Sequence, residues 1–597
     1  MAYASRDDID EKYRWDLTGI FGSDDAFDAA LEEAQALPER YAAFEATATK
    51  SATELLAFLR FDEESDVQMG KLVTYAMRKS DEDTRVARWQ AATSRVMALA
   101  TDIASAASWF TPELLALSDD DIEGYFREEP ALERYRRGIE TRLHMRPHIL
   151  SAPEEALLAR AGEMERSPQN IFELLSDASL SFGDATDSDG KAHPVTHSSF
   201  VPLLMSGDRV LRKSAYDSLY ATYAEMGDTF AATLAAQMKQ LAFRATSRRY
   251  DSTLEMCLDA TEVPTSVYAN LIDTVRKEDN MVPMHAYVTL RKELLGLGEL
   301  RPWDLYVPLA GEVEMKFTFE EAASLMLEAL APLGEQYLSI VEQGLEERWI
   351  DVYETPGKRS GGYSAGGWGM HPVILLNFQG TLDDAYTLVH EMGHSVHTHL
   401  SCKNQPAATS EYAIFVAEVA STVNECLLTR HLLEKYEGRP AERRFVLNHY
   451  LEQFKSTLFR QTMFAEFELK ANEMQARGEG ITAESLCRAY GELVEAYFGA
   501  DLTLDESISL EWARIPHFYY EYYVYQYATG FAAAVALSEK IATEGAPAVG
   551  RYLDFLAGGS SKPPLDLLCG AGVDMTGPEP IEKAIGVFGR LVTEFGA

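Results

Sequence analysis

The sequence predicts a mainly α-helical protein with two lobes and a small β-sheet. Apolar residues recur every three to four positions along 51–80 and 85–110, and proline is sparse in both runs. A chain of 597 residues is long enough for more than one hydrophobic core, so we expect two or more lobes. One β-like run, residues 373–378, stands just before a histidine-rich helix.

Two interruptions of the helical pattern divide the chain. Residues 183–198 are rich in Gly, Asp, Ser and Thr and indicate a hairpin or loop, so we expect an N-terminal helical lobe over 1–200 and a catalytic domain over 201–597. Residues 353–384 contain seven glycines around the β-like run. A glycine-rich loop followed by an edge strand could hold an extended peptide through main-chain hydrogen bonds.

The composition excludes several classes of partner. The chain has 94 acidic and 54 basic side chains, a net charge of −40, which would repel the phosphates of nucleic acid. No apolar run approaches the roughly 20 residues that a membrane-spanning helix needs. The acidic N-terminal segment does not resemble a signal peptide, and five cysteines without a C-x-x-C pair favour reduced thiols. We therefore expect a cytoplasmic protein that binds neither nucleic acid nor membrane.

A metal motif lies in residues 388–400, LVHEMGHSVHTHL, where His390, Glu391 and His394 form the pattern H-E-x-x-H. Positions i and i+4 of a helix share one face, so both imidazoles can bind one cation. We expect one zinc ion per chain, with Glu391 as the general base toward a metal-activated water. Gly393 costs about 1 kcal/mol relative to alanine in mid-helix, which suggests that another backbone approaches it closely.

The third metal ligand has two candidate sources. The longer pattern H-E-x-x-H-x-x-G-x-x-H needs glycine at 397 and histidine at 400, but the chain has His397 and Leu400. The apolar stretch 411–436 carries Glu418 and Glu425 among its hydrophobic residues. A carboxylate on an apolar helix face is costly unless it is paired or bound to metal. We therefore assign Glu418 as the third ligand.

The neighbouring polar residues have less specific interpretations. Glu425 could accept a hydrogen bond from the N–H of a ligand imidazole, or it could be an ordinary ion-pair partner. His397 lies one turn beyond His394 and is expected to support the site or to pack. The alternative for the whole motif is a solvated helix face, which the apolar flanks of the histidines disfavour.

A second chemically suggestive segment, residues 512–531, reads WARIPHFYYEYYVYQYATGF. Packing of an aromatic helix accounts for most of its rings. However, a zinc peptidase needs a hydrogen-bond donor for the oxyanion that forms when water attacks a carbonyl. His517 and Tyr525 are our candidates for this role, and Tyr522 is a weaker candidate.

Four stretches of the sequence together resemble oligoendopeptidase F, of the thimet oligopeptidase and neurolysin group of zinc metallopeptidases. They are GKRSGGYS, ILLNFQGTLDDAYTLVHEMGHSVHTHL, EYAIFVAEVASTVNECLL and IPHFYYEYYVYQYATGF. The start of the chain, KYRWDLTGIFGSDDAF, is also similar to that branch, so the resemblance extends from about residue 10 to 590. The segment GWGMHPVILLNF departs from the tyrosine-richer version of the branch.

The resemblance implies a helical ellipsoid of two lobes with a deep central channel that admits short unstructured peptides and has zinc on its floor. The family's zinc ligands fall on His390, His394 and Glu418, and its general base falls on Glu391. Its transition-state histidine and tyrosine fall on His517 and Tyr525. The loop 361–369, which includes Gly362, matches the family's flexible substrate loop.

We therefore expect a zinc-dependent endopeptidase that hydrolyses short oligopeptides. The first alternative is a zinc exopeptidase, such as a carboxypeptidase, with the same metal site. The second is a peptide-binding protein without catalytic activity, which the intact Glu391 and three candidate ligands disfavour.

Overall fold

The structure is a computed structural model that describes residues 3–311, 313 and 315–597. Helices dominate and the strands are short, which confirms the mainly α-helical prediction. The chain forms two compact units: unit 1 consists of Met1–Pro147, Met315–His431 and Leu537–Val573, and unit 2 of His148–Glu314, Leu432–Ala536 and Asp574–Ala597. The expected boundary near residue 200 falls inside unit 2, and the division into 1–200 and 201–597 stays a prediction.

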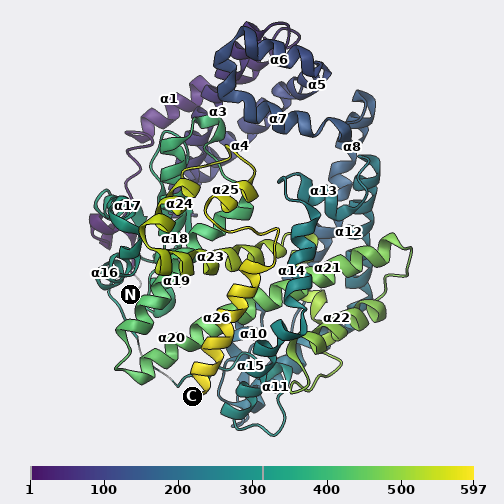
Figure 1. Ribbon diagram of the computed structural model, residues 1–597, viewed down its shortest axis with the longest axis vertical. Coiled ribbons are helices and arrows are strands. Elements are labelled where there is room, and N and C mark those ends of the chain that lie inside the picture. The colour runs from purple at the N-terminus through teal and green to yellow at the C-terminus, as the bar shows by residue number, and fades with distance from the viewer. Residues whose placement is uncertain (1–2, 312, 314) are drawn as a thin grey trace. The chain divides into compact units, whose positions relative to one another are not determined.

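Unit 1 contains the N-terminal helices, a small sheet and the helix with the H-E-x-x-H motif (Figure 1). Its helices are α1 (Asp24–Ala34), α2 (Leu37–Ala42), α3 (Ala52–Glu82), α4 (Ala87–Ala107), α5 (Phe110–Ala116), α6 (Asp119–Glu128), α7 (Arg136–His144), α16 (Phe319–Leu330), α17 (Gly334–Glu346), α18 (Leu382–Asn404), α24 (Ala546–Leu556) and α25 (Pro564–Gly570). Two further helices, α19 (Ile414–Lys435) and α23 (Tyr525–Glu544), each begin in one unit and end in the other.

The sheet of unit 1 has three short strands in the order β3-β5-β4, so β4 is an edge strand. The strand β3 (Ile350–Asp351) runs parallel to β5 (Val373–Leu375), and β4 (Tyr363–Ala365) runs antiparallel to it. The N–H of Ile374 bonds to Trp349 on the β3 side, so its partner in β4, Ser364, turns its main-chain N–H and C=O away from β5.

The sheet is fixed by apolar burial against the N-terminal helices. Phe27, Phe58 and Trp89 belong to the same hydrophobic cluster as Val373 and Leu375 of β5. Burial of each large apolar side chain contributes roughly 1.5–3 kcal/mol relative to exposure. The N-terminal helices therefore support the strand that precedes the histidine helix.

Unit 2 is a second helical body with a short hairpin. Its helices are α8 (Ala152–Glu165), α9 (Ser167–Glu173), α10 (His197–Leu204), α11 (Arg209–Glu225), α12 (Gly227–Ser247), α13 (Thr253–Asp259), α14 (Thr265–Val275), α15 (Glu278–Leu294), α20 (Pro440–Gln453), α21 (Arg460–Ala476), α22 (Ala483–Phe498) and α26 (Glu579–Gly596). The strands β1 (Ala185–Thr186) and β2 (Ala192–His193) pair antiparallel, which confirms the hairpin expected within 183–198. In the described part of the chain, no helix combines the length and the apolar character needed to cross a bilayer.

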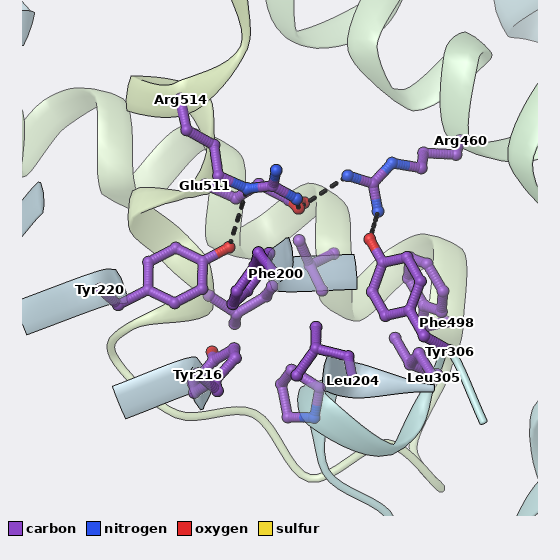
Figure 2. Close-up of a pocket in the computed structure, with 13 residues that line it drawn as sticks. Phe200, Leu204, Tyr216, Tyr220, Leu305, Tyr306, Arg460, Phe498, Glu511 and Arg514 are labelled. Carbon is purple, nitrogen blue, oxygen red and sulfur yellow. Dashed lines mark hydrogen bonds and ion pairs between the residues drawn. The ribbon is translucent and has the colours of Figure 1, made fainter. Parts of the chain in front are cut away.

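A small cavity of about 20 Å³ in unit 2, enough for one water molecule, lies beside a buried ionic cluster (Figure 2). Glu511 accepts hydrogen bonds from Arg460 at 2.7 Å and from Arg514 at 2.8 Å. Burial alone would raise the pKa of Glu511, but the two guanidinium groups lower it to about 2. The cluster therefore fixes the chain three residues before His517 to α21.

Candidate metal centre and active site

The helix α18 presents the motif histidines on its less buried face. Thr381 caps the helix, and its N–H donates to the Asp384 carboxylate at 2.8 Å in a capping box. Val389, Met392 and Val396 are at most 1% exposed and face the interior. The side chains of His390 and His394, one turn apart, are 25% and 17% exposed. Periodicity alone thus directs both imidazoles into one half-open site.

Glu418 of α19 completes a compact group of three ligand atoms. The Nε2 atoms of His390 and His394 are 3.2 Å apart. The Oε2 atom of Glu418 lies 3.4 Å from Nε2 of His390 and 3.6 Å from Nε2 of His394. Among the residues that the structure describes, these three form a group that could hold a metal ion. Their ligand atoms all lie within 4.8 Å of one another.

The dimensions of this triangle fit a tetrahedral zinc site. Zinc binds imidazole nitrogen and carboxylate oxygen at about 2.0–2.2 Å, so two ligands of a tetrahedral ion lie about 3.3–3.6 Å apart. The three observed separations, 3.2, 3.4 and 3.6 Å, fall close to this range. Three protein ligands would leave a fourth position for water or substrate, as catalytic zinc sites do.

Polar neighbours orient two of the three candidate ligands. The Oε1 atom of Glu425 lies 2.5 Å from Nδ1 of His390, so this carboxylate accepts the second ring N–H and directs Nε2 toward the metal position. The hydroxyl of Ser421 donates to Oε2 of Glu418 at 3.1 Å. Asn424 donates to the main-chain oxygen of Val389 at 3.2 Å and thereby joins α19 to α18.

The site carries an excess of negative charge that favours a cation. Burial alone would lower the pKa of His390, but hydrogen bonds to Glu418 and Glu425 outweigh it and raise the pKa to about 10. Burial alone would raise the pKa of Glu418, but the two imidazoles lower it well below its usual range. The carboxylates therefore stabilise positive charge at the point where the ligand atoms converge.

Glu391 lies beside this group and is 7% exposed. Burial raises the pKa of Glu391, and a hydrogen bond from the Ser364 main chain partly offsets this effect. A Cβ atom added to Gly362 would meet Cγ2 of Thr387 at 2.9 Å and Oε1 of Glu391 at 3.8 Å. The edge strand β4 and the glycine before it therefore lie against the expected general base.

Gly393 allows α18 and α19 to pack closely. An added Cβ atom would lie 2.7 Å from Cα of Ser421 and 2.9 Å from the main-chain oxygen of Ala420. This contact confirms the expectation that another backbone approaches Gly393. The glycine thus sets the spacing between the helices that carry the two imidazoles and Glu418.

We expect Gly393→Ala to destabilise the protein by about 1–3 kcal/mol and to weaken metal binding, because α19 must move away from α18. The helix propensity of alanine offsets at most about 1 kcal/mol of this cost. Denaturant unfolding and metal titration would measure both effects. Gly586→Ala is a matched control, since Gly586 lies inside α26 and an added Cβ meets nothing within 4 Å. Wild-type stability and metal affinity in Gly393→Ala would contradict this explanation.

His397 has a packing role. It is 1% exposed, and its ring stacks on Tyr412 with a centroid distance of 3.6 Å. Burial lowers the pKa of His397 to about 3, so the ring is neutral. The group of three ligand atoms does not include it.

His517 lies in unit 2 within a short 3₁₀ segment, Pro516–Tyr519. Burial lowers the pKa of His517. Its ring contacts Tyr520, Tyr523 and Tyr527 at centroid distances of 5.5, 6.5 and 5.9 Å. Sequence reasoning missed these three tyrosines as neighbours of His517, because it assumed a continuous helical spacing from 517 onward.

The two tyrosines chosen from the sequence lie deeper in unit 2. Tyr525 is 2% exposed and Tyr522 is 1% exposed, and both rings contact Tyr268. The hydroxyl of Tyr522 bonds to that of Thr253 at 2.9 Å. The described contacts do not bring either ring against His517, and the roles of His517, Tyr525 and Tyr522 stay predictions.

Comparisons with known proteins agree with this fold and metal group. Residues 203–587 match the model of peptidase family M3, and residues 113–182 match the model described as oligopeptidase F. The chain is similar to oligopeptidase PepF of Bacillus subtilis strain 168, with 44% identity over 99% of this chain and 88% of the relative.

Two solved structures share the fold over nearly the whole chain. A structure from Chlamydophila abortus has 36% identity and a TM-score of 0.92, and covers 99% of each chain. The crystal structure of oligoendopeptidase-F from Enterococcus faecium has 38% identity and a TM-score of 0.74, over 96% of this chain and 98% of that chain.

The helical fold, the His-His-Glu group and these relatives define the class of protein, which is a metallo-endopeptidase. Since the family model matches well over half of its residues, the chain belongs to peptidase family M3.

Proposed function

We propose that the chain is a zinc-dependent endopeptidase that hydrolyses short, unstructured oligopeptides. The observation that carries this proposal is the triangle of His390 Nε2, His394 Nε2 and Glu418 Oε2, with separations of 3.2–3.6 Å and Glu391 beside it. One zinc ion per chain would be held by these three residues. Bound zinc lowers the pKa of water to about 7 and polarises a carbonyl group.

Glu391 is proposed as the proton carrier of the reaction. Its buried carboxylate accepts a proton from the attacking water and then gives that proton to the nitrogen of the leaving amine. The upward shift of its pKa supports this role, because a carboxyl group whose pKa lies closer to neutral pH can both accept and release a proton. The hydrogen bond from the Ser364 main chain keeps the carboxylate in place.

The edge strand β4 is proposed to hold the peptide in an extended conformation. The main chain of Ser364 faces away from β5, and its carbonyl can accept a peptide N–H. Gly362, next to this strand, is the proposed contact of the glycine-rich loop with substrate. A β-strand edge recognises main chain rather than a folded surface, which supports short unstructured peptides as substrates. Relatives are named oligopeptidase and oligoendopeptidase, which supports the same substrate class.

His517 and Tyr525 are proposed to donate hydrogen bonds to the oxyanion, with Tyr522 as a weaker contact to substrate. The lowered pKa of His517 favours a neutral ring whose N–H can donate. Tyr525 is buried. Its proposed role therefore requires that the segment of residues 511–525, which ends at Tyr525, keeps a defined position. We further propose a cytoplasmic location, in line with the reduced thiols expected from the sequence.

Endopeptidase and exopeptidase action can be separated with end-blocked peptides. An acetylated and amidated peptide of about ten residues with an internal quenched fluorophore should be cleaved at rates similar to those of the unblocked peptide. Mass spectrometry would place the cleaved bond in the interior. An exopeptidase would fail on the blocked peptide. A non-catalytic peptide-binding protein would cleave neither peptide when fully loaded with zinc.

A further inference from the structure

The tyrosine-rich segment of unit 2, residues 511–525, is attached at both ends to one helix, α21. At its start, Glu511 accepts a hydrogen bond from Arg460, the first residue of α21, at 2.7 Å. At its other end, Glu468 of α21 accepts a hydrogen bond from the main-chain N–H of Tyr522 at 2.7 Å. Arg460 and Glu468 are eight residues apart and thus lie near one face of the helix.

The turn that Glu468 contacts has an uncommon backbone conformation. Glu521 and Tyr522 have φ values of 55° and 61°, in the left-handed region. Such a conformation is strained for a non-glycine residue and persists only where its surroundings enforce it. The turn ends the 3₁₀ segment of His517 and directs the chain into α23, whose first residue is Tyr525.

Other contacts hold the side chains of this turn, whereas Glu468 holds its main chain. Arg244 pairs with the Glu521 carboxylate at 2.6 Å, and Thr253 bonds to the Tyr522 hydroxyl at 2.9 Å. Glu468 is 3% exposed, so no solvent is available to replace it as acceptor for the buried Tyr522 N–H. Nothing in the proposed reaction chemistry itself uses this buried carboxyl group.

We propose that Glu468 is a positioning residue for catalysis, which holds the 521–522 turn in its left-handed conformation and thereby fixes Tyr525 relative to His517. The proposal rests on the proposed function, in which these two side chains act on the oxyanion. Glu468 lies in unit 2, whereas the metal ligands lie in unit 1, so its loss should leave metal binding intact.

Glu468 performs this role as a neutral carboxylic acid near neutral pH. Burial raises the pKa of Glu468 to about 8, with a smaller contribution from the charge of Glu521. The titratable groups facing it are Glu521, Cys257, Tyr268 and Tyr522, and Glu521 is itself paired with Arg244. A glutamine side chain should therefore substitute well, because its amide oxygen can accept the same N–H.

The test compares variants of the full-length, zinc-loaded enzyme on a short quenched peptide. Glu468→Leu removes the acceptor, and Glu468→Asp withdraws it by one methylene. Both should lower kcat by about 10- to 100-fold while KM and zinc content stay near wild type, since misplaced catalytic groups cost rate. Glu468→Gln should keep kcat within about threefold of wild type. Glu466→Gln is the matched control: this buried glutamate of α21 bonds to Tyr497 and pairs with Arg276 and Lys470, all of which lie outside residues 511–525.

The pH dependence of stability gives a second readout. The folded protein retains a proton on Glu468 that the unfolded chain releases above about pH 4.5, so folding stability is lost as pH rises from 4.5 to 8. Glutamine does not titrate. The melting temperature of Glu468→Gln relative to wild type should therefore increase from pH 5 to pH 8 and then level off.

The outcomes separate this inference from the proposed function. Wild-type kcat in both Glu468→Leu and Glu468→Asp would overturn the inference and leave the peptidase assignment intact. A fall of kcat in Glu466→Gln equal to that in Glu468→Asp would also overturn it, because a general loss of α21 packing would then explain both. A zinc-loaded wild type that cleaves no peptide would instead remove the proposed function. If Glu468→Leu does not fold, Glu468→Asp and the pH series decide the question.

Discussion

Glu391→Gln should keep its metal ion and lose peptide cleavage by about 10²- to 10⁴-fold in kcat/KM, the usual contribution of a general acid–base group. Glutamine has nearly the same shape, so the contact with Ser364 and the spacing to the ligands can persist. It cannot accept the proton of the attacking water at neutral pH. The loss corresponds to about 3–5 kcal/mol of transition-state stabilisation.

The measurement combines initial rates on a short quenched peptide with atomic spectroscopy of bound zinc. Asp383→Asn, which removes an exposed acid in the first turn of the same helix, serves as the control and should retain wild-type rates. If Glu391→Gln retains more than a few per cent of the wild-type rate, Glu391 is not the base.

Glu418→Ala should abolish both stoichiometric zinc binding and activity. Glu418 is proposed to supply one of three protein ligands, and water in its place would not balance the charge of the ion. Loss of an outer hydrogen-bond partner alone costs about 10- to 100-fold in metal affinity, and loss of a direct ligand should cost more. The side chain is 35% exposed, so its removal leaves no buried cavity and the apo protein should unfold near the wild-type midpoint.

Glu425 provides a graded comparison in the same zinc titration. Glu425→Ala removes the acceptor of the His390 Nδ1–H and should lower zinc affinity by about 10- to 100-fold. Glu425→Gln retains an acceptor oxygen and should lie between Glu425→Ala and wild type. Full zinc occupancy in Glu418→Ala would contradict the ligand assignment. Equal affinity in the two Glu425 variants would contradict the role given to the Glu425 oxygen as acceptor for His390.

The metal group could be predicted from helix geometry, which places the two histidines, and from the cost of a carboxylate on an apolar helix face. His390 and His394 share a face at i and i+4, and an apolar helix could carry Glu418 only with a partner. Gly393 was a further usable signal, since an unfavourable mid-helix glycine indicated the close backbone of α19. Asn424, which joins the two helices, stands in an apolar run and could have been found by the same reasoning.

Other features depend on tertiary structure that local patterns do not encode. Each unit is assembled from three separate segments of the chain, whereas composition suggested one boundary near residue 200. The strand β4 is three residues long and gave no periodic signal. The left-handed residues Glu521 and Tyr522 break the helical spacing, so the tyrosines beside His517 are Tyr520, Tyr523 and Tyr527.

His390, His394 and Glu418 are proposed to converge on one zinc ion. Anomalous diffraction from crystals of the zinc-loaded protein, recorded on both sides of the zinc absorption edge, tests it most directly. We expect one strong anomalous peak per chain, about 2.0–2.2 Å from the Nε2 atoms of both histidines and an oxygen of Glu418. A peak bound to other residues, or no peak here at saturating zinc, would contradict it.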